Sequence, residues 1–428
     1  MRATVKVAVI GAGLQGLCTA YYLAKAGIEA TVLERNDGPA LEASFGNGGY
    51  LQAECPETWN QPGIPGALPK WWWASLGRNR KNAAKLLRTA ELLRLLPWGV
   101  RFLRASNAET FFRHVAHNRE LARYTLDCMA ALRRETSIEY AHRACGSLFI
   151  FRSQGALKGF GPLLDHLGGN GAEWQQLNRD AILQSEPSLR PIGDSLQGGI
   201  LFPNDESGDS YRFSQALAEM AVRSGVQFEY GQQVSRIAAN NGGVSIRAGT
   251  QELRTDALVI AAGAHSGRLA ASIGVRLPIA PAKGYSLTIP LGDWPDPPRH
   301  VIADTGVHAG INVLGNSLRI AGTADFCGFD ARIDPGRIGY MVRLVEAVLP
   351  EFAKVMDRSA IRPFAGLRPL SADGLPIIGA TGVPNVYANT GHGGLGWTLA
   401  AGSAKALADQ ISGASPAIDL TPFSPLRF

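Results

Sequence analysis

The sequence predicts a mixed α/β and α+β fold, in which a parallel-sheet domain alternates along the chain with a second, mainly antiparallel-sheet domain. Three observations lead to this prediction. A strand, a glycine loop, a helix and a second strand follow one another within the first 34 residues; an apolar strand ending in small residues occupies 256–266; and strand-like segments dominate 276–364. A chain of 428 residues is long enough for two domains.

The first of these units has the features of a Rossmann-like nucleotide site. An apolar strand leads into a G-x-G-x-x-G motif, a helix follows, and the next strand ends at Glu34. In such a unit Gly11 allows the tight turn, Gly13 leaves room for a pyrophosphate, and Gly16 lets the helix pack close to the strand. The Glu34 carboxylate lies where it can accept hydrogen bonds from ribose hydroxyls. We therefore predict that this part of the chain binds a dinucleotide.

The later elements follow in an order that suggests interleaved domains. Helices are predicted from about 80 to 137 and near 160–167, 213–225 and 338–349, and strands near 148–151, 226–230, 234–237 and 244–247. Glycine-rich blocks occupy 366–379 and 391–398, and the second opens a helix. We predict that segments 1–56, 195–275 and 365–428 form the cofactor-binding domain, and that 57–194 and 276–364 form the substrate domain, with the reactive site at their junction.

Charge is unevenly distributed. The net charge is +6, and nine basic residues but one acid lie between Lys70 and Arg104, among tryptophans and leucines. This pattern is typical of an interfacial segment on an anionic membrane. It also fits a pair of solvated helices whose Trp/Leu face packs on the protein, which the sequence slightly favours. Nucleic-acid binding is less favoured, because no recognition module accompanies the charge.

The five cysteines show neither disulfide-framework nor metal-ligand spacing, so we expect reduced cysteines and no metal site. The apolar run at 7–24 is explained by the nucleotide-binding unit and not by a signal peptide. We therefore expect a cytoplasmic protein, with peripheral contact at the inner face of the cell membrane through 70–104 as the alternative.

Six motifs in one order extend the argument beyond the glycine loop. They are G-A-G-L-Q-G at 11–16, the small-residue loop at 44–49, F-P-N-D-E-S-G-D at 202–209, K-G-Y-S at 283–286, G-L-R-P at 366–369 and G-H-G-G-L-G-W at 391–397. Together they resemble the FAD-dependent D-amino-acid dehydrogenases, bacterial members of the D-amino-acid oxidase, glycine oxidase and sarcosine oxidase superfamily. The resemblance runs from about residue 5 to about residue 410.

This resemblance implies an FAD cofactor and the residues around it. Backbone N–H groups at 393–396 would face the N1–C2=O edge of the flavin. Relatives with covalent flavin use a cysteine near the position of Arg368, and this chain has no cysteine after Cys327, so the FAD is expected to be non-covalent. The expected FAD-binding residues are Gly11, Gly13, Leu14, Gln15, Gly16, Glu34, Arg35, Ser44, Asn47, Gly48, Gly49, Val234, Ala262, Gly263, Gly391, Gly393, Gly394, Leu395 and Gly396.

The resemblance also assigns a substrate clamp. Arg368 matches the position that binds the substrate carboxylate, with Arg362 as a competitor. Tyr285 is a further candidate for the catalytic pocket, with a packing role equally compatible with the sequence. Many relatives carry a tyrosine on the strand that aligns with 308–313, whereas Gly310 here would leave room for a larger or N-substituted substrate.

The implied activity is oxidation of a D-amino acid, or of a D-proline-type secondary amino acid, by hydride transfer to flavin N5. The product is an imino or 2-oxo acid, and the electrons pass to a quinone-type acceptor. Because the cofactor takes the electrons, no strong catalytic base is needed. Two alternatives stay open, namely a glycine/sarcosine-type amine oxidase that uses O₂ and a non-catalytic FAD-binding subunit.

Overall fold

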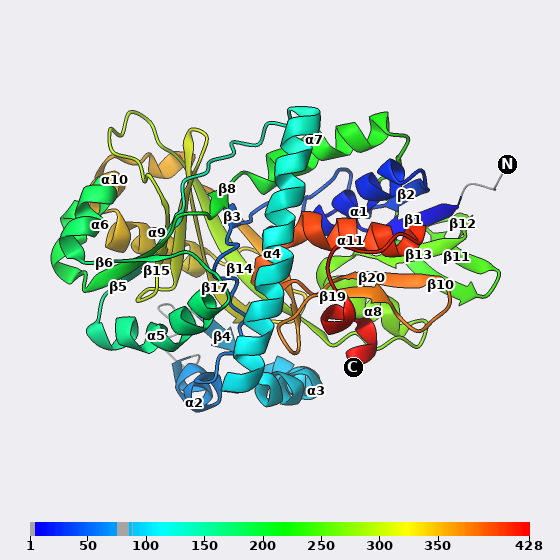
Figure 1. The fold of residues 1–428 in the computed structure, drawn as a ribbon, viewed down its shortest axis with the longest axis horizontal. Coiled ribbons are helices and arrows are strands. Elements are labelled where there is room, and N and C mark those ends of the chain that lie inside the picture. The colour runs from blue at the N-terminus through cyan, green and yellow to red at the C-terminus, as the bar shows by residue number, and fades with distance from the viewer. Residues whose placement is uncertain (1–4, 75–84, 88) are drawn as a thin grey trace.

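Two sheets organise the protein. The computed structural model describes residues 5–74, 85–87 and 89–428. Four basic residues of the segment at 70–104 lie outside the described residues, namely Arg78, Arg80, Lys81 and Arg88. One sheet lies toward the N-terminus in the view of Figure 1 and the other lies at the opposite end of the molecule, with the long helix α4 (Ala108–Thr136) between them.

The first sheet is the nucleotide-binding type. In the described chain it has the order β19–β20–β13–β1–β2–β9, parallel except for β19 against β20. Val9 pairs with Val32 on one side and with Val259 on the other. The strands are β1 (Lys6–Ile10), β2 (Glu29–Leu33), β9 (Gln227–Glu229), β13 (Ala257–Ile260), β19 (Ile377–Ala380) and β20 (Val386–Thr390).

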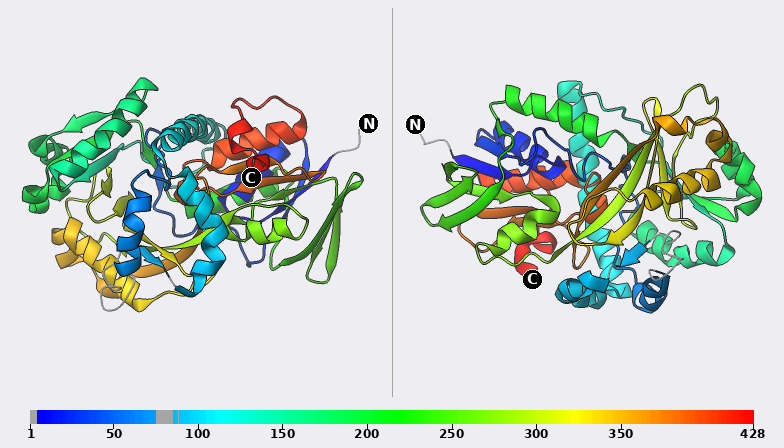
Figure 2. Two further views of the ribbon diagram at one scale, coloured as in Figure 1. Left: turned by 90° about the horizontal axis from the view of Figure 1, so that it is seen from below. Right: turned by 180° about the vertical axis from the view of Figure 1, so that it is seen from behind.

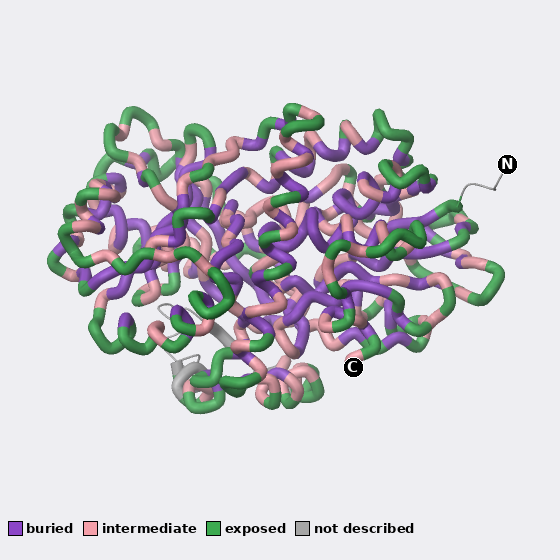
Figure 3. The backbone as a smooth tube through the Cα atoms, in the orientation of Figure 1, coloured by how far each residue is buried: buried purple, intermediate pink, exposed green. Residues whose placement is uncertain are grey.

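Both faces of this sheet are covered, which explains why its strands are apolar almost throughout. Because side chains alternate along a strand, Val7 and Val9 face the helices α1, α7 and α11, whereas Ala8 and Ile10 face α8 and a three-stranded sheet. Figure 3 shows the buried residues concentrated along these strands. The covering elements are α1 (Leu14–Lys25), α7 (Ser210–Arg223), α8 (Ser266–Ala271), α11 (Ala400–Ser412), β10 (Val234–Asn240), β11 (Gly243–Ala248) and β12 (Gln251–Thr255).

The second sheet is mainly antiparallel, as predicted. Its order in the described chain is β18–β14–β17–β16–β15–β5–β7–β6, with β4 paired to β17. The β5–β15 and β4–β17 pairs are parallel. The strands are β4 (Lys85–Leu87), β5 (Ser147–Phe151), β6 (Gln175–Leu177), β7 (Gly198–Phe202), β14 (Ile279–Pro290), β15 (Val301–Asp304), β16 (Ala309–Leu314), β17 (Ser317–Phe326) and β18 (Arg362–Ser371).

One face of the second sheet packs on α9 and α10, where Leu287 and Ile320 meet Met341 and Phe352 (Figure 2). The other face turns toward the first sheet. A short pair, β3 (Tyr50–Leu51) with β8 (Glu206–Ser207), lies apart from both sheets. The remaining helices are α2 (Ile64–Ala74), α3 (Thr89–Ala105), α5 (Gln154–Gly169), α6 (Arg179–Ser185), α9 (Pro335–Val348) and α10 (Pro350–Val355).

The chain therefore builds its parallel sheet from stretches that are far apart in sequence, which confirms the predicted fold class. Two strands of the second sheet lie within segments that we predicted for the cofactor-binding domain. β7 lies in segment 195–275 and most of β18 lies in segment 365–428, yet both pair in the second sheet. The five-segment division stays a prediction. Its boundaries at 195 and 365 do not coincide with the change of sheet.

Helix α4 carries a buried ion pair that ties it to the loop after β3. The helix begins after Asn107, whose side chain accepts a hydrogen bond from the Thr110 backbone N–H. Midway along, the Arg119 guanidinium donates to the Glu54 carboxylate at 2.6 and 3.1 Å. It also donates to the Asn170 and Gly171 carbonyls. Both side chains of the pair are buried, so each depends on the other.

We expect Arg119→Met to destabilise the fold by about 3–5 kcal/mol, because it leaves the Glu54 carboxylate buried without its partner. Urea unfolding of the holoenzyme would measure the loss. Arg113→Met on the same helix is the matched control: it breaks an exposed pair with Glu109 and should cost at most about 1 kcal/mol. Equal losses in the two variants would show that the buried pair does not stabilise this junction.

Candidate active site

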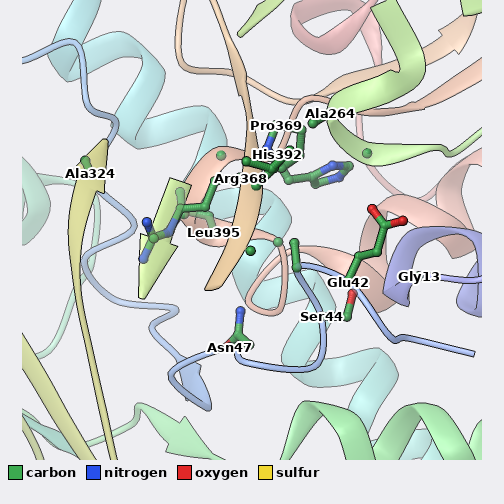
Figure 4. Close-up of a pocket in the computed structure, with 18 of the residues that line it drawn as sticks. Gly13, Glu42, Ser44, Asn47, Ala264, Ala324, Arg368, Pro369, His392 and Leu395 are labelled. Carbon is green, nitrogen blue, oxygen red and sulfur yellow. The ribbon is translucent and has the colours of Figure 1, made fainter. Parts of the chain in front are cut away.

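A cavity of about 950 Å³ lies between the two sheets and is lined by residues of both. Figure 4 shows Arg368 at one side of this space and Gly13 and Glu42 toward the other. Clefts at domain junctions commonly hold ligands, and this one has two chemically different ends. The first contains the glycine motif, and the second contains Arg368.

At the first end, the three glycines of the motif serve different steric purposes. Gly11 has a φ of +105°, and a Cβ there would lie 2.6 Å from the Ala261 carbonyl oxygen. A Cβ on Gly16 would overlap the Gly11 carbonyl oxygen. Gly11 and Gly16 are therefore required by the fold itself. A Cβ on Gly13 would meet only the Ser44 hydroxyl at 3.4 Å, and Gly13 lines the cavity, so its missing side chain leaves space for a ligand.

Glu34 closes the same end beside the motif. One carboxylate oxygen accepts a hydrogen bond from the Ala12 backbone N–H at 2.7 Å, and the other accepts from the backbone and side-chain nitrogens of Asn36 at 2.9 and 2.7 Å. Arg35 forms an ion pair with Glu42. Glu34, Arg35, Asn36 and Glu42 thus line the end of the cavity where the sequence predicts a ribose.

The glycine-rich segment after β20 forms the cavity wall near Gln15. Its short turn, η5 (Gly393–Leu395), leads toward α11. The Gln15 amide donates to the Gly396 carbonyl at 2.7 Å and joins this segment to α1. His392 is buried, with Nε2 at 3.0 Å from the Ser403 hydroxyl, and burial lowers the pKa of His392 to about 3. The imidazole is therefore neutral and unsuited to a base near neutral pH, as expected for a structural histidine.

Arg368 projects from β18 across the second sheet. Its guanidinium occupies the space above Gly284 on β14, where a Cβ would overlap it, and Nη1 donates to the Thr323 carbonyl on β17 at 3.0 Å. Thr323 has a φ of +64°, a conformation uncommon for a β-branched residue. The Trp59 ring lies 5.8 Å from the Arg368 Cζ. The Arg368 side chain is therefore positioned by the Thr323 carbonyl, by the space that Gly284 leaves and by the Trp59 indole.

This guanidinium forms no ion pair in the described part of the chain. No carboxylate of the residues with described side chains lies within 4 Å of it, and the nearby Asp325 is paired with Arg337. Desolvation lowers the pKa of Arg368 to about 10, partly offset by the charge of Asp325, so the side chain stays cationic at neutral pH. A partly buried cation with one carbonyl partner is stabilised when an anion joins it. The arrangement therefore fits a ligand carboxylate at this end and a dinucleotide at the other.

Most predicted site residues line the cavity, including Arg368, Glu34, Ser44, Val234 and Gly263. Gly16, Gly49 and Gly391 do not line it. Gly16 is packed against the Gly11 carbonyl, and Gly391 borders a small adjoining recess. Arg362 is exposed and lies outside the cavity, so it does not compete with Arg368 for the clamp.

Two predicted pocket positions have surroundings that the sequence did not reveal. Tyr285 adjoins the cavity, but strand alternation turns its ring into the core against α9, and its hydroxyl is enclosed. This placement favours the packing role that the sequence left equally open, and the catalytic role of Tyr285 stays a prediction. The room expected at Gly310 is also taken, because the Tyr50 hydroxyl fills the position of a side chain there. Gly310 accommodates Tyr50 and does not enlarge the space for a substrate.

Several lining residues escaped the sequence interpretation. Glu57, Trp59 and Gln61 lie in the proline-rich connection after β3, which the sequence predicts only as irregular. Trp98 and Phe102 on α3 stack with ring centroids 4.8 Å apart, and the Trp98 indole donates to the Leu370 carbonyl. Their sequence signal is the aromatic and leucine content of 70–104. That content does not reveal which face of the helix meets the cavity.

Helices α2 and α3 form an apolar border on one side of the cavity. Ile64, Leu68, Leu95 and Leu103 line it. Trp73 and Leu93 on the same helices are 70% and 83% exposed. No helix within the described ranges combines the length and the apolar character that crossing a bilayer requires.

Comparison with known proteins matches this arrangement to one family. The model of the DAO family, described as FAD dependent oxidoreductase, matches residues 6–410. A D-amino acid dehydrogenase of Rhizorhabdus wittichii is 35% identical over 415 residues, covering 97% of this chain and 98% of that protein. A D-amino acid dehydrogenase of Allorhizobium ampelinum is 37% identical over 417 residues, covering 97% and 96%.

Solved structures share the fold at lower sequence identity. Glycine oxidase from Geobacillus kaustophilus superposes with a TM-score of 0.76 at 22% identity, covering 99% of this chain and all of the other. L-Proline dehydrogenase from P. horikoshii also gives a TM-score of 0.76, at 16% identity, covering 100% of this chain and 98% of the other. These likenesses show that this chain shares the fold of both structures.

We expect Gly13→Val to abolish flavin binding while leaving the fold intact, because the isopropyl group would project into the cavity and not into the protein. The ratio of flavin to protein absorbance in the purified variant measures this. Gly155→Val is the control, since its Cβ would meet no atom within 4 Å and it lies far from the cavity lining. A fully loaded yellow Gly13→Val protein would refute the assigned pyrophosphate position.

Proposed function

This chain belongs to the FAD-dependent oxidoreductase family, and from that membership we propose that it oxidises a D-amino acid, or a D-proline-type secondary amino acid, to an imino or 2-oxo acid. The observation that carries the proposal is the partly buried, cavity-lining Arg368 guanidinium, which forms no ion pair with the described side chains. The naming of two relatives at 35% and 37% identity as D-amino acid dehydrogenases supports the choice of substrate class.

In this proposal the protein contributes binding and orientation. Arg368 offers a planar pair of N–H donors, which can grip a carboxylate at two points and fix the direction of the α-carbon. FAD, when bound, supplies the acceptor for the α-hydrogen and its two electrons. The residues expected to hold it are those of the glycine motif, Glu34 and the segment from Gly393 to Gly396.

We propose that the FAD is held without a covalent bond. Cys55 is the one cysteine lining the cavity in the described part of the chain. Its thiol faces Glu57 at 3.8 Å, and burial together with that carboxylate raises the pKa of Cys55 well above its ordinary value. The sulfur is therefore a protonated thiol at neutral pH and a poor nucleophile.

The electron acceptor is proposed to be a quinone that reaches the protein at an anionic membrane surface. The apolar border formed by α2 and α3 supports this, because it combines cavity-lining leucines with the exposed Trp73 and Leu93. Arg94 and Arg104 are exposed on the same α3 helix. Exposed Trp and Leu beside arginines are typical of interfacial helices. The proposed location is thus the cytoplasmic side, with peripheral contact at the inner face of the cell membrane.

We expect anaerobic mixing of the yellow holoenzyme with D-amino acids to bleach the flavin, and their L-isomers to leave it oxidised. In Arg368→Met the FAD should stay bound while the second-order rate of bleaching falls about 100-fold, since a charge-assisted bidentate contact is lost. Stopped-flow absorbance measures both. Arg362→Met, on the same strand but exposed and outside the cavity, should react like the parent enzyme.

Other results would assign a different function. Bleaching by glycine, sarcosine and similar amines alone, with rapid reoxidation by O₂, would indicate an amine oxidase. A flavin that no amino acid bleaches would indicate a non-catalytic FAD-binding subunit. An unchanged rate in Arg368→Met would remove that residue from substrate binding.

We expect the double variant Trp73→Glu/Leu93→Glu to bind vesicles containing anionic lipid about tenfold more weakly than the parent, because each change removes an exposed apolar side chain from the interface. Flotation with vesicles measures the bound fraction. Val222→Glu on α7 is the matched control, an exposed apolar residue on a distant helix (Figure 1). Absence of vesicle binding by the parent would favour the alternative of two solvated helices.

A further inference from the structure

We propose that Glu57 is the counter-charge for the amino group of the substrate, so that Arg368 and Glu57 together recognise a zwitterion and Glu57 takes up the ammonium proton. This inference rests on the proposed function, because it assumes that an amino acid is bound with its carboxylate on Arg368. It adds a substrate-binding residue and a proton acceptor from a segment that the sequence predicted only as an irregular connection.

The position of Glu57 is defined by a well-anchored loop. Three residues earlier, Glu54 is held by the buried ion pair with Arg119. Three residues later, the Asn60 amide donates to the Phe102 carbonyl at 3.0 Å and to the Ala372 carbonyl at 3.1 Å. Glu57 is therefore fixed between two buried attachment points, one on α4 and one shared by α3 and the strand region after β18.

Trp59 places this loop beside the clamp. Its ring lies 5.8 Å from the Arg368 guanidinium carbon, and its indole nitrogen lies 3.3 Å from where a Cβ of Gly394 would be. Glu57 and Trp59 both line the main cavity, and both border the small recess next to η5. The loop with Glu57 and Trp59 thus lies where the Arg368 end of the cavity meets the segment at 393–396, and there we place the amino group of a bound amino acid.

Glu57 is also the carboxylate that the rest of the protein leaves without a strong donor. Four carboxylates line the cavity in the described chain. Glu34 accepts from two backbone N–H groups and an asparagine amide, while Glu42 and Asp304 each pair with an arginine. Glu57 accepts only from the Gln61 amide at 2.8 Å and, weakly, from the Cys55 thiol.

The two ends of a zwitterion match what the cavity offers. The Arg368 guanidinium and the Glu57 carboxylate line one cavity, both are partly buried, and neither forms an ion pair with a described side chain. Burying each charge alone is costly, and a ligand that carries both opposite charges relieves both costs at once. A carboxylic acid without an amino group would relieve only the first.

The same carboxylate suits a proton acceptor. An α-ammonium has no lone pair, so its N–H bond must break before the α-carbon can lose its hydrogen with two electrons to FAD. The proton would pass to a Glu57 oxygen, giving a neutral carboxylic acid that later releases it to water. Burial raises the pKa of Glu57 to about 7, which brings it closer to that of an amine than an exposed carboxylate would be.

Around Glu57 the neighbouring thiol, imidazole and guanidinium keep their charge state near neutral pH, whereas burial raises the pKa of Asp205, whose charge also acts on Cys55, to about 7 as well. Burial raises the pKa of the Cys55 thiol and lowers that of His392 to about 3, so both stay neutral. Arg368 stays cationic. No described charged side chain of α3 lines the cavity. A rise in amino-acid affinity between pH 6 and 8 is therefore assigned to ionisation of Glu57 where Glu57→Gln, which leaves Asp205 in place, abolishes that rise.

Equilibrium binding measurements can distinguish the contribution of Arg368 to affinity from that of Glu57. Calorimetry on the dithionite-reduced holoenzyme, which cannot oxidise an amino acid, would compare D-alanine with propionate and D-proline with cyclopentanecarboxylate. We expect Glu57→Gln to weaken both amino acids about 10- to 100-fold and to leave both amine-free acids unchanged. Arg368→Met should weaken all four. Glu109→Gln, an exposed carboxylate on α4, is the control and should change none.

The pH dependence provides a second readout that a purely structural role would not alter. In the parent enzyme the affinity for the amino acids should rise from pH 6 to pH 8, and in Glu57→Gln it should be flat over that range. Equal weakening of amino acids and amine-free acids by Glu57→Gln would overturn the proposal, because it would indicate a distorted pocket. Unchanged affinities would overturn it as well. A parent enzyme that binds neither amino acid would instead contradict the proposed function itself.

Discussion

The constraint on which the site depends is a partly buried guanidinium that forms no ion pair with a protein carboxylate among the described side chains. Arg368 stays cationic at neutral pH, yet its hydrogen bond within the described chain goes to a neutral group, the Thr323 carbonyl. The desolvation free energy of such a charge is unfavourable, and the rest of the fold must offset it until a ligand of opposite charge binds. The surrounding structure is consistent with that role: β14 has a glycine beneath the side chain, and β17 turns a carbonyl toward it through an unusual backbone angle at Thr323.

The parallel sheet supplies the second fixed point. Its strands are covered on both faces, by helices on one and by α8 with the three-stranded sheet on the other, so its loops are rigidly placed. The turn after β1 and the segment after β20 meet through the bond from Gln15 to the Gly396 carbonyl. Because these segments are neighbours in the fold but 381 positions apart in the chain, the cofactor end of the cavity exists only in the folded protein.

The loop after β3 lies between these two ends, and it contains both a buried ion pair that stabilises the fold and residues that line the cavity. Its attachment through Glu54 and Arg119 holds the α4 helix, and its middle places Glu57 and Trp59 in the cavity. The same wall continues into α2 and α3, whose apolar residues reach both the cavity and the surface. Substrate recognition and the route to an acceptor would therefore share one structural element. That element is the part of the chain whose sequence is least regular.

The sequence by itself determined the features that depend on local sterics and on the order of elements. The turn at Gly11, the close packing at Gly16 and the open side of Gly13 follow from backbone geometry within one unit, and the structure has them as predicted. Arg368 was identified through its motif. Tertiary structure alone decided the rest. Whether Tyr285 faces the core or the cavity depends on strand register, and whether Gly310 leaves space depends on Tyr50, 260 positions away. Likewise, the role proposed for Glu57 depends on packing. Glu42 and Asp304 each pair with an arginine, whereas Glu57 accepts a hydrogen bond from the uncharged Gln61 amide. Such pairings are properties of packing between distant segments, and no local pattern encodes them.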